Sequence, residues 1–341
     1  MHKELELWQF VAERLSRNES VMLLVVAESS GSSPGRQGYK MAVGADGKLI
    51  GSIGGGVMEV ALVEQSREIL SVPCAVAGRQ LQKPARSKGA TSNAHVSEQI
   101  HRKGVPNPSG MICSGKQTVI FKLLTPESDK TIESIIVSLQ NRRPTAFFIS
   151  SNELSIGPRE TSSDISTFEK HSDDDFVYQE KLGFKNDLFI IGGGHCAFAL
   201  SELMSKMDFH ISIFDDRPEL NTIEKNRFAH EIKIIDGYGS IGDEIPSGQN
   251  VYVVVMTLGY AFDKLVIQKL LDKEFNYFGV LGSRAKMATL TKELKAEGFP
   301  AERLDRIYTP IGLPINSHTP EEIAISIAAQ IISIKNRRSE M

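Results

Sequence analysis

A glycine turn directly after an apolar segment is the strongest chemical signal in the sequence. Gly192-Gly193-Gly194-His195-Cys196-Ala197 follows DLFII and fits the pattern G-x-G-x-x-G/A. Between a strand and a helix, this pattern presents backbone N–H groups and the positive end of the helix dipole to a phosphate. We therefore expect Gly192 and Gly194 to contact a nucleotide-type ligand. His195 either contacts the same ligand or caps the helix, and Cys196 is expected to be a packing residue.

Two charged residues at the end of the next apolar segment bear on the identity of this ligand. Asp215 stands 23 residues after Gly192, where an acidic residue accepts a hydrogen bond from the ribose of NAD. Arg217 is a residue type that binds the 2′-phosphate of NADP instead. The sequence leaves NAD, NADP and neither of the two as open alternatives.

Alternating strands and helices must position this turn. Strands are expected over 187–194, 210–216, 231–236, 251–257 and 277–282, with helices over 195–207 and 265–272. This alternation predicts an α/β fold with a Rossmann-like C-terminal domain, built on a doubly wound parallel sheet. A last helix begins near Thr319, since Thr319 and Glu322 can form a capping box with Pro320 in the first turn.

The first half of the chain follows a different pattern. Helices are expected over 3–16, 57–70 and 131–141, and strands over 21–29, 117–124 and 145–150, with a hairpin at Asp46-Gly47 and a triple glycine at 54–56. This pattern predicts a smaller N-terminal α/β domain with a mixed sheet over residues 1–150. The polar, acidic segment 151–186 is expected to be a linker with room for a short hairpin, and the Rossmann-like domain is expected over 187–341.

Residues 75–110 carry a local excess of positive charge. The segment is rich in Gly, Ser, Pro and Asn and has no apolar periodicity, which predicts a long mobile loop. This basic loop is either a solvated surface or a flap that binds an anion or a partner. Its only acidic residue is Glu98, against Arg79, Lys83, Arg86, Lys88, Arg102 and Lys103.

The whole-chain composition excludes several classes of protein. A length of 341 residues suggests about two domains, and three widely spaced cysteines form neither a disulfide framework nor a zinc-binding pair. The N-terminal residues do not resemble a signal peptide and no apolar run is long enough to span a membrane, so we expect a cytoplasmic protein. A net charge of −3 without a basic helix argues against nucleic-acid binding.

Several motifs, taken in order, resemble the xanthine dehydrogenase accessory proteins of the XdhC/CoxI type. They lie at 31–41, 46–47, 51–59, 192–197, 215–217, 282–286, 310–313 and 319–324. The resemblance implies a chaperone that binds molybdenum cofactor (molybdopterin) and delivers it, in mature form, to the apo-enzyme of a xanthine dehydrogenase or aldehyde oxidase-type molybdenum hydroxylase. It also implies an accessory role rather than catalysis, a homodimer as the expected assembly, and a cysteine desulfurase as a further partner.

The resemblance also assigns roles to individual residues. A molybdopterin site needs backbone donors and cations, and the expected cofactor-binding set is Arg36, Gly54, Gly55, Gly56, Glu59, Cys113, Gly192, Gly194, His195, Asp215, Arg217, Arg284 and Lys286. Cys113 is the candidate metal ligand. Two positions depart from the family pattern: Val57 stands where a cysteine is common, and Leu258 where relatives often carry histidine.

Two other functions fit the residues. An NAD(P)-dependent oxidoreductase would use the glycine turn in the ordinary way, although no His/Asp pair stands out after it. An interaction module with a vestigial Rossmann fold would use neither the turn nor the cofactor.

Overall fold

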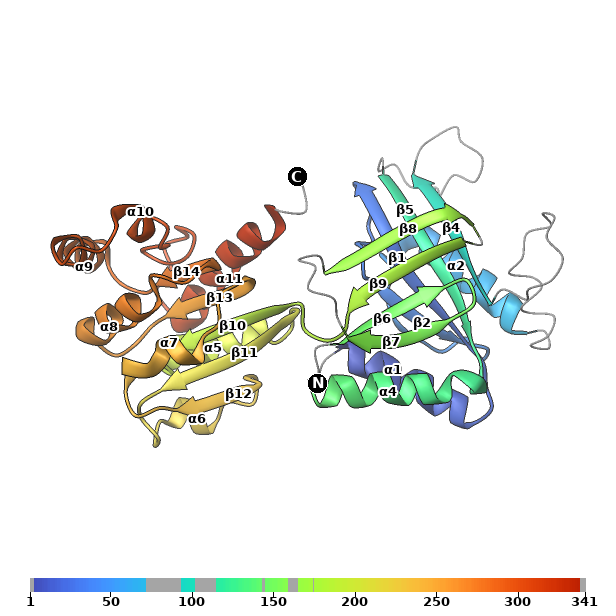
Figure 1. Cartoon of the computed structure of the whole chain (residues 1–341), viewed down its shortest axis with the longest axis horizontal. Helices are drawn as coiled ribbons and strands as arrows, with labels where there is room; N and C mark the ends of the chain where they lie inside the picture. Colours follow the sequence, from blue (N-terminus) through green and yellow to red (C-terminus); the bar gives the residue numbers. More distant parts are fainter. Residues whose placement is uncertain are drawn as a thin grey trace. The chain divides into compact units, whose positions relative to one another are not determined.

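The chain folds into two units, residues 1–183 and residues 184–341, in the computed structural model shown in Figure 1. The structure describes residues 3–71, 93–101, 115–142, 145–158, 165–173 and 175–337. Each unit has its own hydrophobic core. The boundary falls at Gly183, close to the end of the segment that was expected to be a linker.

The first sheet of unit 1 is antiparallel throughout and has the order β3-β2-β1-β5-β4. Its strands are β1 (Val21–Gly31), β2 (Lys40–Gly44), β3 (Leu49–Gly51), β4 (Ala94–His101) and β5 (Gly115–Leu124). The hairpin at Asp46-Gly47 is confirmed, with Gly47 at φ +81°. The expectation of one long loop over 75–110 is wrong at β4, an edge strand in which Ala94 and Val96 are the buried apolar residues among the described side chains, and the rest of the expected loop lies outside the described residues.

The second sheet of unit 1 replaces the expected linker. Its order is β7-β6-β9-β8, again antiparallel, with β6 (Thr145–Ser150), β7 (Leu154–Pro158), β8 (Ser166–Ser172) and β9 (Asp175–Lys181). Strand β9 alternates, since Phe176, Tyr178 and Glu180 are buried while the intervening side chains are more exposed. In an antiparallel sheet with one solvated face, every second residue of a strand is polar. This explains why 151–186 resembled a linker.

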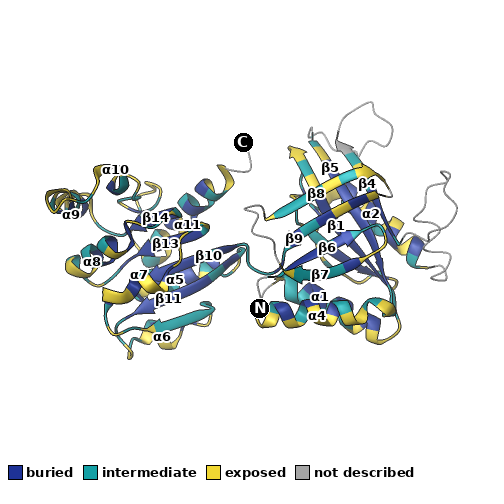
Figure 2. Ribbon diagram, viewed as in Figure 1, coloured by how far each residue is buried: buried dark blue, intermediate teal, exposed yellow. Residues whose placement is uncertain are grey.

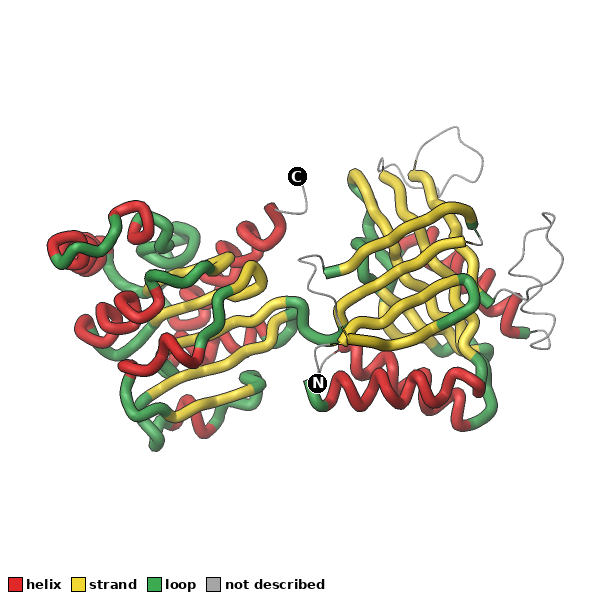
Figure 3. Tube along the Cα trace, in the orientation of Figure 1, coloured by secondary structure: helices red, strands yellow, loops and turns green. Residues whose placement is uncertain are grey.

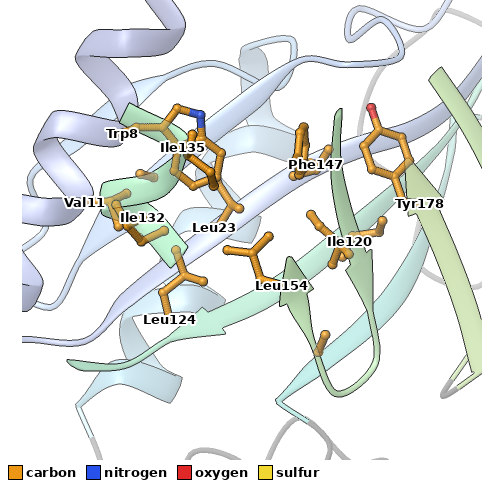
Figure 4. Packing of buried hydrophobic residues seen from close by; sticks show 14 of the residues in the cluster. Trp8, Val11, Leu23, Ile120, Leu124, Ile132, Ile135, Phe147, Leu154 and Tyr178 are labelled. Atoms are coloured by element: carbon orange, nitrogen blue, oxygen red, sulfur yellow. The ribbon is translucent and has the colours of Figure 1, made fainter. Parts of the chain in front are cut away.

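Unit 1 has two hydrophobic cores, one on each face of its first sheet. Helices α1 (Lys3–Ser16) and α4 (Asp129–Gln140) join one core with residues from both sheets, including Trp8, Leu23 and Phe147 (Figure 4). Helix α2 (Gly56–Leu70) covers the opposite face of the first sheet. A short η1 turn (Pro126–Ser128) precedes α4. Near the end of the unit, the N–H of Gly183 donates to Glu4 Oε2 of α1 at 2.9 Å.

Unit 2 is a doubly wound parallel sheet of order β12-β11-β10-β13-β14, so the Rossmann-like expectation is confirmed. Its strands are β10 (Asn186–Ile191), β11 (Phe209–Asp215), β12 (Glu231–Ile234), β13 (Gly248–Val255) and β14 (Phe275–Val280). Figure 2 shows β10 and β11 largely buried, whereas the edge strand β12 is not, and Figure 3 shows helices along both faces. From β10 the chain adds β11 and β12 on one side of the sheet, and then adds β13 and β14 on the other side. This fold binds ligands at such a switch point, which here lies between β10 and β13.

Helices cover both faces of the unit 2 sheet. They are α5 (His195–Met204), α6 (Asn221–Glu224), α7 (Ile241–Glu244), α8 (Tyr260–Leu270), α9 (Arg284–Ala296), α10 (Ala301–Leu304) and α11 (Pro320–Arg337), with η2 at Tyr238–Ser240. Helices α5 and α11 share one core, and α7, α8 and α9 share the other. The capping box of α11 is confirmed, because Thr319 and Glu322 exchange hydrogen bonds of 3.3 and 3.2 Å. Among the helices that the structure describes, none is long and apolar enough to cross a membrane.

Candidate functional site

The glycine turn of unit 2 lies at the switch point and is packed closely on two sides. Gly192 has φ +106°, and a Cβ added there would lie 2.3 Å from the carbonyl oxygen of Met256 at the end of β13. A Cβ on Gly193 would lie 2.7 Å from Ile223 of α6. The turn therefore needs glycine at Gly192 for packing alone, independent of any ligand, whereas a Cβ on Gly193 would require the Ile223 side chain to move.

The third glycine of this turn faces open space. A Cβ added to Gly194 would have no atom within 4 Å, and Gly194 is the N-cap of α5 without a side-chain cap. The first turn of α5 contains no acidic residue, and His195 is exposed beside it. The helix N-terminus therefore keeps its positive dipole end and its unbonded N–H groups on an accessible surface, which suits an anion. The alternative of His195 as a cap is not seen.

Asp215 and Arg217 contact each other rather than an open pocket. The Asp215 carboxylate is fully buried, and it accepts hydrogen bonds from Arg217 Nε at 2.8 Å, Arg217 Nη2 at 2.7 Å and the Arg217 N–H at 2.9 Å. The N–H of Gly193 donates to the same carboxylate at 2.6 Å. Burial favours the neutral acid, but these hydrogen bonds outweigh it and hold the pKa of Asp215 below its ordinary value. Asp215 is thus an ionised anchor for the glycine turn.

Lys286 also has an internal partner. Its Nζ lies 2.5 Å from Asp263 Oδ2 on α8, and Asp263 is fully buried. The hydroxyl of Thr257, just after β13, donates to Asp263 Oδ1 at 2.5 Å. The ammonium group that was expected to attract an anion is therefore largely neutralised by Asp263. Leu258, beside Thr257, is 76% exposed at the same end of the sheet.

Arg284 lines a groove of unit 2 to which no residue of the glycine turn contributes. Its side chain is exposed at the first turn of α9 and lines a shallow groove of about 600 Å³ with Lys292, Lys295, Thr309 and Pro310. Arg284 thus contributes to a basic groove along α9 rather than to the contacts around Gly194 that the structure records.

In unit 1, a carboxylate of the chain itself occupies the anion position that was expected at the glycine run. Gly54, Gly55 and Gly56 have φ of +127°, +75° and +73°, which only glycine adopts easily. Glu59, one turn into α2, accepts hydrogen bonds at its Oε2 from the N–H groups of Ile53 (2.8 Å) and Gly55 (2.9 Å). One donor of the expected anion cradle, the N–H of Gly55, and the neighbouring N–H of Ile53 are therefore bound to an internal carboxylate, which acts as the anion.

A buried amide that the sequence reasoning missed joins this run to the preceding loop. Gln117 of β5 is fully buried, and its Oε1 accepts from the Ser33 hydroxyl (2.8 Å) and the Gly35 N–H (3.2 Å). Its Nε2 donates to the carbonyl of Ile53 at 2.8 Å. A Cβ on Gly35 would lie 2.1 Å from that same carbonyl. The one signal in the sequence was a glutamine at the start of an apolar strand.

The other expected residues of unit 1 are peripheral or undescribed. Arg36 is exposed beside the Gly35 loop, and Val57 is 65% exposed at the start of α2. Cys113 lies outside the described residues. Within the described ranges, no group of three His, Cys, Asp or Glu side chains is placed to hold a metal ion. In unit 2, Cys196 is half-buried, and burial raises the pKa of its thiol, which suits the packing role expected for it.

Each unit thus brings together part of the expected set. Unit 1 places Gly54, Gly55, Gly56 and Glu59 in one internally bonded loop. In unit 2 the residues grouped around one turn are Gly192, Gly194, His195, Asp215 and Arg217. The open anion position among these residues is at Gly194.

Comparisons with known proteins match both units. The XdhC Rossmann domain family matches residues 188–331, and the XdhC and CoxI family matches residues 14–73. The chain is 23% identical over 311 residues to the uncharacterized protein YqeB of Escherichia coli (strain K12), covering 91% of this chain and 43% of that protein. It is 28% identical over 162 residues to a probable xanthine dehydrogenase subunit of Bacillus subtilis (strain 168), covering 47% of this chain and 46% of that protein.

These matches cover less than half the length of either curated relative. Among solved structures, the fold resembles a crystal structure described as a xanthine dehydrogenase from Bacillus halodurans, with a TM-score of 0.68 and 22% identity. That similarity covers 98% of this chain and 96% of the other, so the whole fold is shared.

Proposed function

Because the chain belongs to the XdhC and CoxI family, we propose that it is an accessory protein of the xanthine dehydrogenase system. Its cargo is the molybdenum cofactor, which it delivers to the apo-enzyme of a molybdenum hydroxylase. The curated Bacillus subtilis relative, described as part of a probable xanthine dehydrogenase, supports the link to this system. The observation that carries the cofactor proposal is the open, uncapped N-terminus of α5 at Gly194.

The phosphate end of such a cofactor fits this position. Gly194 leaves room for a phosphate to approach the backbone, and the first turn of α5 has no carboxylate to repel it. The N–H groups that begin the helix are the donors, and the exposed His195 adds a further donor. Gly192 and Asp215 hold the turn in shape from behind, the first through contact with β13 and the second through the N–H of Gly193.

The remaining expectations extend this proposal. Cys113 is the proposed ligand for the metal end, since a thiolate is a soft ligand suited to such a centre. A cysteine desulfurase is the proposed sulfur donor, the proposed assembly is a homodimer, and the proposed location is the cytoplasm. Arg36 and Arg284, both exposed, are proposed to contact anionic surfaces of cargo or client.

The oxidoreductase alternative receives less support from the geometry. A dinucleotide enzyme of this fold uses the acidic residue after the second strand to bind ribose, and in this chain Asp215 is already bound by Arg217 and Gly193. A vestigial, ligand-free Rossmann domain fits less well, because Gly194 is neither packed against another residue nor capped.

A co-purification experiment tests the proposal. The full-length protein is produced in a host that makes the cofactor, and molybdenum is measured by mass spectrometry and the oxidised pterin by fluorescence. We expect near-stoichiometric cofactor on the wild type and a loss of at least about tenfold in Gly194→Asp, whose carboxylate occupies the phosphate position. Gly194→Asn is the control, because it can cap α5 without adding charge. Absence of molybdenum and pterin from the wild type would refute cofactor binding.

A second pair of variants tests the metal end. Cys113→Ser is expected to retain pterin but lose molybdenum, or its exchangeable sulfur, relative to the wild type. Cys196→Ser serves as the matched cysteine control, because Cys196 is a half-buried packing residue. Equal molybdenum content in both variants and the wild type would remove Cys113 from the site.

A further inference from the structure

The pairing of Asp215 with Arg217 has a consequence for what the unit 2 site can accept. In Rossmann domains, a free carboxylate after the second strand favours NAD, whereas an arginine nearby accommodates the extra phosphate of NADP. This chain carries both residue types two positions apart and bonds them to each other through two charge-assisted contacts of 2.7 and 2.8 Å. Neither residue is then available in the form that either dinucleotide requires.

Arg217 excludes the ribose of NAD. The carboxylate oxygens of Asp215 accept four hydrogen bonds, from three nitrogen atoms of Arg217 and from the N–H of Gly193. A ribose hydroxyl would have to displace a guanidinium from a fully buried carboxylate. A neutral hydroxyl is a weaker donor than a guanidinium, so this exchange is unfavourable.

Asp215 and its neighbour exclude the 2′-phosphate of NADP. To bind that phosphate, Arg217 would have to turn away from Asp215 and leave a buried negative charge without its main partner, beside another anion. Asp216 adds a second carboxylate, 3.9 Å from Arg217 Nε. A phosphate held by Arg217 would lie beside both of these carboxylates, and like charges repel, more strongly where they are buried.

We propose that the Asp215–Arg217 pair makes this Rossmann domain selective against adenine dinucleotides of both kinds, and that it thereby reserves the open position at Gly194 for a phosphate-bearing ligand without an adenosine ribose. Each residue alone would admit one dinucleotide, and together they exclude both. The inference does not depend on which cargo the protein carries, since it concerns only the ribose side of the turn.

Two substitutions in the full-length protein test it by gain of binding. In Arg217→Ala, Asp215 keeps the N–H donors of Gly193 and of residue 217 but loses the guanidinium, so NAD affinity should rise at least about tenfold over the wild type. In Asp215→Asn, the amide oxygen still accepts from Gly193 while Arg217 is released, so NADP affinity should rise by a similar factor and exceed NAD affinity. Titration calorimetry with NAD and NADP measures both.

Controls separate this effect from a change in folding. Arg227→Ala removes an exposed arginine and should leave dinucleotide affinity at the wild-type level, and thermal melting of every variant establishes which are folded. Arg217→Ser, which keeps a small donor to Asp215, replaces Arg217→Ala if that variant does not fold. Micromolar binding of either dinucleotide by the wild type would overturn the inference. A folded Arg217 variant without any gain in NAD affinity would overturn it equally, whereas co-purified cofactor has no bearing on this result.

Discussion

The two glycine turns of the molecule look alike in sequence and differ in the structure. Both precede a helix, at Gly54–Gly56 and at Gly192–Gly194. In unit 1, the carboxylate of Glu59 binds two N–H groups of the turn from inside the molecule. Both N-cap glycines, Gly55 and Gly194, face open space and lack a side-chain cap, but in unit 2 the first turn of α5 contains no carboxylate.

The comparison shows that a glycine turn before a helix predicts an arrangement of donors but does not predict what they bind. An acidic residue one turn into the helix can satisfy the donors itself, as Glu59 does. Helix α5 has no acidic residue in its first turn. What distinguishes the two turns is a carboxylate in the first turn of the following helix, since the internal carboxylate of unit 2, Asp215, comes from the next strand and accepts from Gly193.

The largest expected change in stability follows from the close packing of the unit 2 turn. Gly192→Ala should lower the free energy of unfolding of unit 2 by about 4 kcal/mol, because a Cβ there overlaps the backbone and the positive φ adds strain. The overlapping atom is the Met256 carbonyl oxygen, at 2.3 Å. Chemical denaturation of the full-length protein measures the change. Gly194→Ala is the matched control, since nothing lies within 4 Å of its added Cβ; equal losses in the two variants would contradict the packing argument.

The next largest effect is expected at the support of the unit 1 turn. Gln117→Ala removes three buried hydrogen bonds to Ser33, Gly35 and Ile53, and leaving their groups unsatisfied should lower the free energy of unfolding by about 3 kcal/mol. Its neighbour provides the control: Thr118 is buried, and its hydroxyl has no hydrogen-bond partner among the described residues. Thr118→Val should therefore be neutral in the same denaturation experiment, and a loss as large as that of Gln117→Ala would show that the strand position, not the amide, matters.

A smaller effect is expected when the internal carboxylate is removed. Glu59→Ala should lower the free energy of unfolding by about 1–2 kcal/mol, since the turn loses its capping acceptor. The same change frees the N–H groups of Ile53 and Gly55, so inorganic sulfate should now stabilise the protein more than it stabilises the wild type. Thermal melting with and without sulfate measures both effects. Glu64→Ala, an exposed position on the same helix, should show neither.

The smallest change in stability is expected when a carboxylate is added to the open turn of unit 2, by analogy with Glu59 in unit 1. Gly194→Asp places a carboxylate at the N-cap of α5, in open space and at an allowed φ of −69°. It should leave the melting temperature unchanged or raise the free energy of unfolding by up to about 1 kcal/mol, while abolishing stabilisation by inorganic phosphate. A loss of stability in this variant would show that the turn is less open than Gly194 indicates.

The sequence was most informative where elements are apolar on one side or both. The parallel strands of unit 2, the fingerprint at Gly192 and the capping box at Thr319 were all predicted, because each depends on neighbouring residues in the chain. Family membership was predicted for the same reason, from short motifs in order. Strands β7, β8 and β9 were not, since their outer faces are polar, although β6–β7 and β8–β9 are pairs of neighbouring strands.

The sequence also did not predict which charged side chains of the site pair with one another. Lys286 and Arg217 were interpreted as charges available to a ligand, yet each has a buried carboxylate as its partner, at Asp263 and Asp215. The sequence shows which charges exist but not which of them neutralise one another, because that depends on where strand ends and helix starts meet in space. Glu59 was likewise expected to contact the cofactor, whereas in the folded chain its carboxylate accepts hydrogen bonds from the N–H groups of Ile53 and Gly55.

The contact between Glu4 and Gly183 also determines how early unit 1 can complete its folding during synthesis. It joins residues 179 positions apart, the beginning and the end of unit 1. A ribosome adds about 5–20 residues per second, so the first helix waits roughly 10–40 s before its last partner exists. During that interval the apolar face around Trp8, which is fully buried in the finished unit, lacks strands β6 and β9 to cover it. A nascent chain of this protein is therefore expected to need protection from aggregation until residue 183 has left the ribosome.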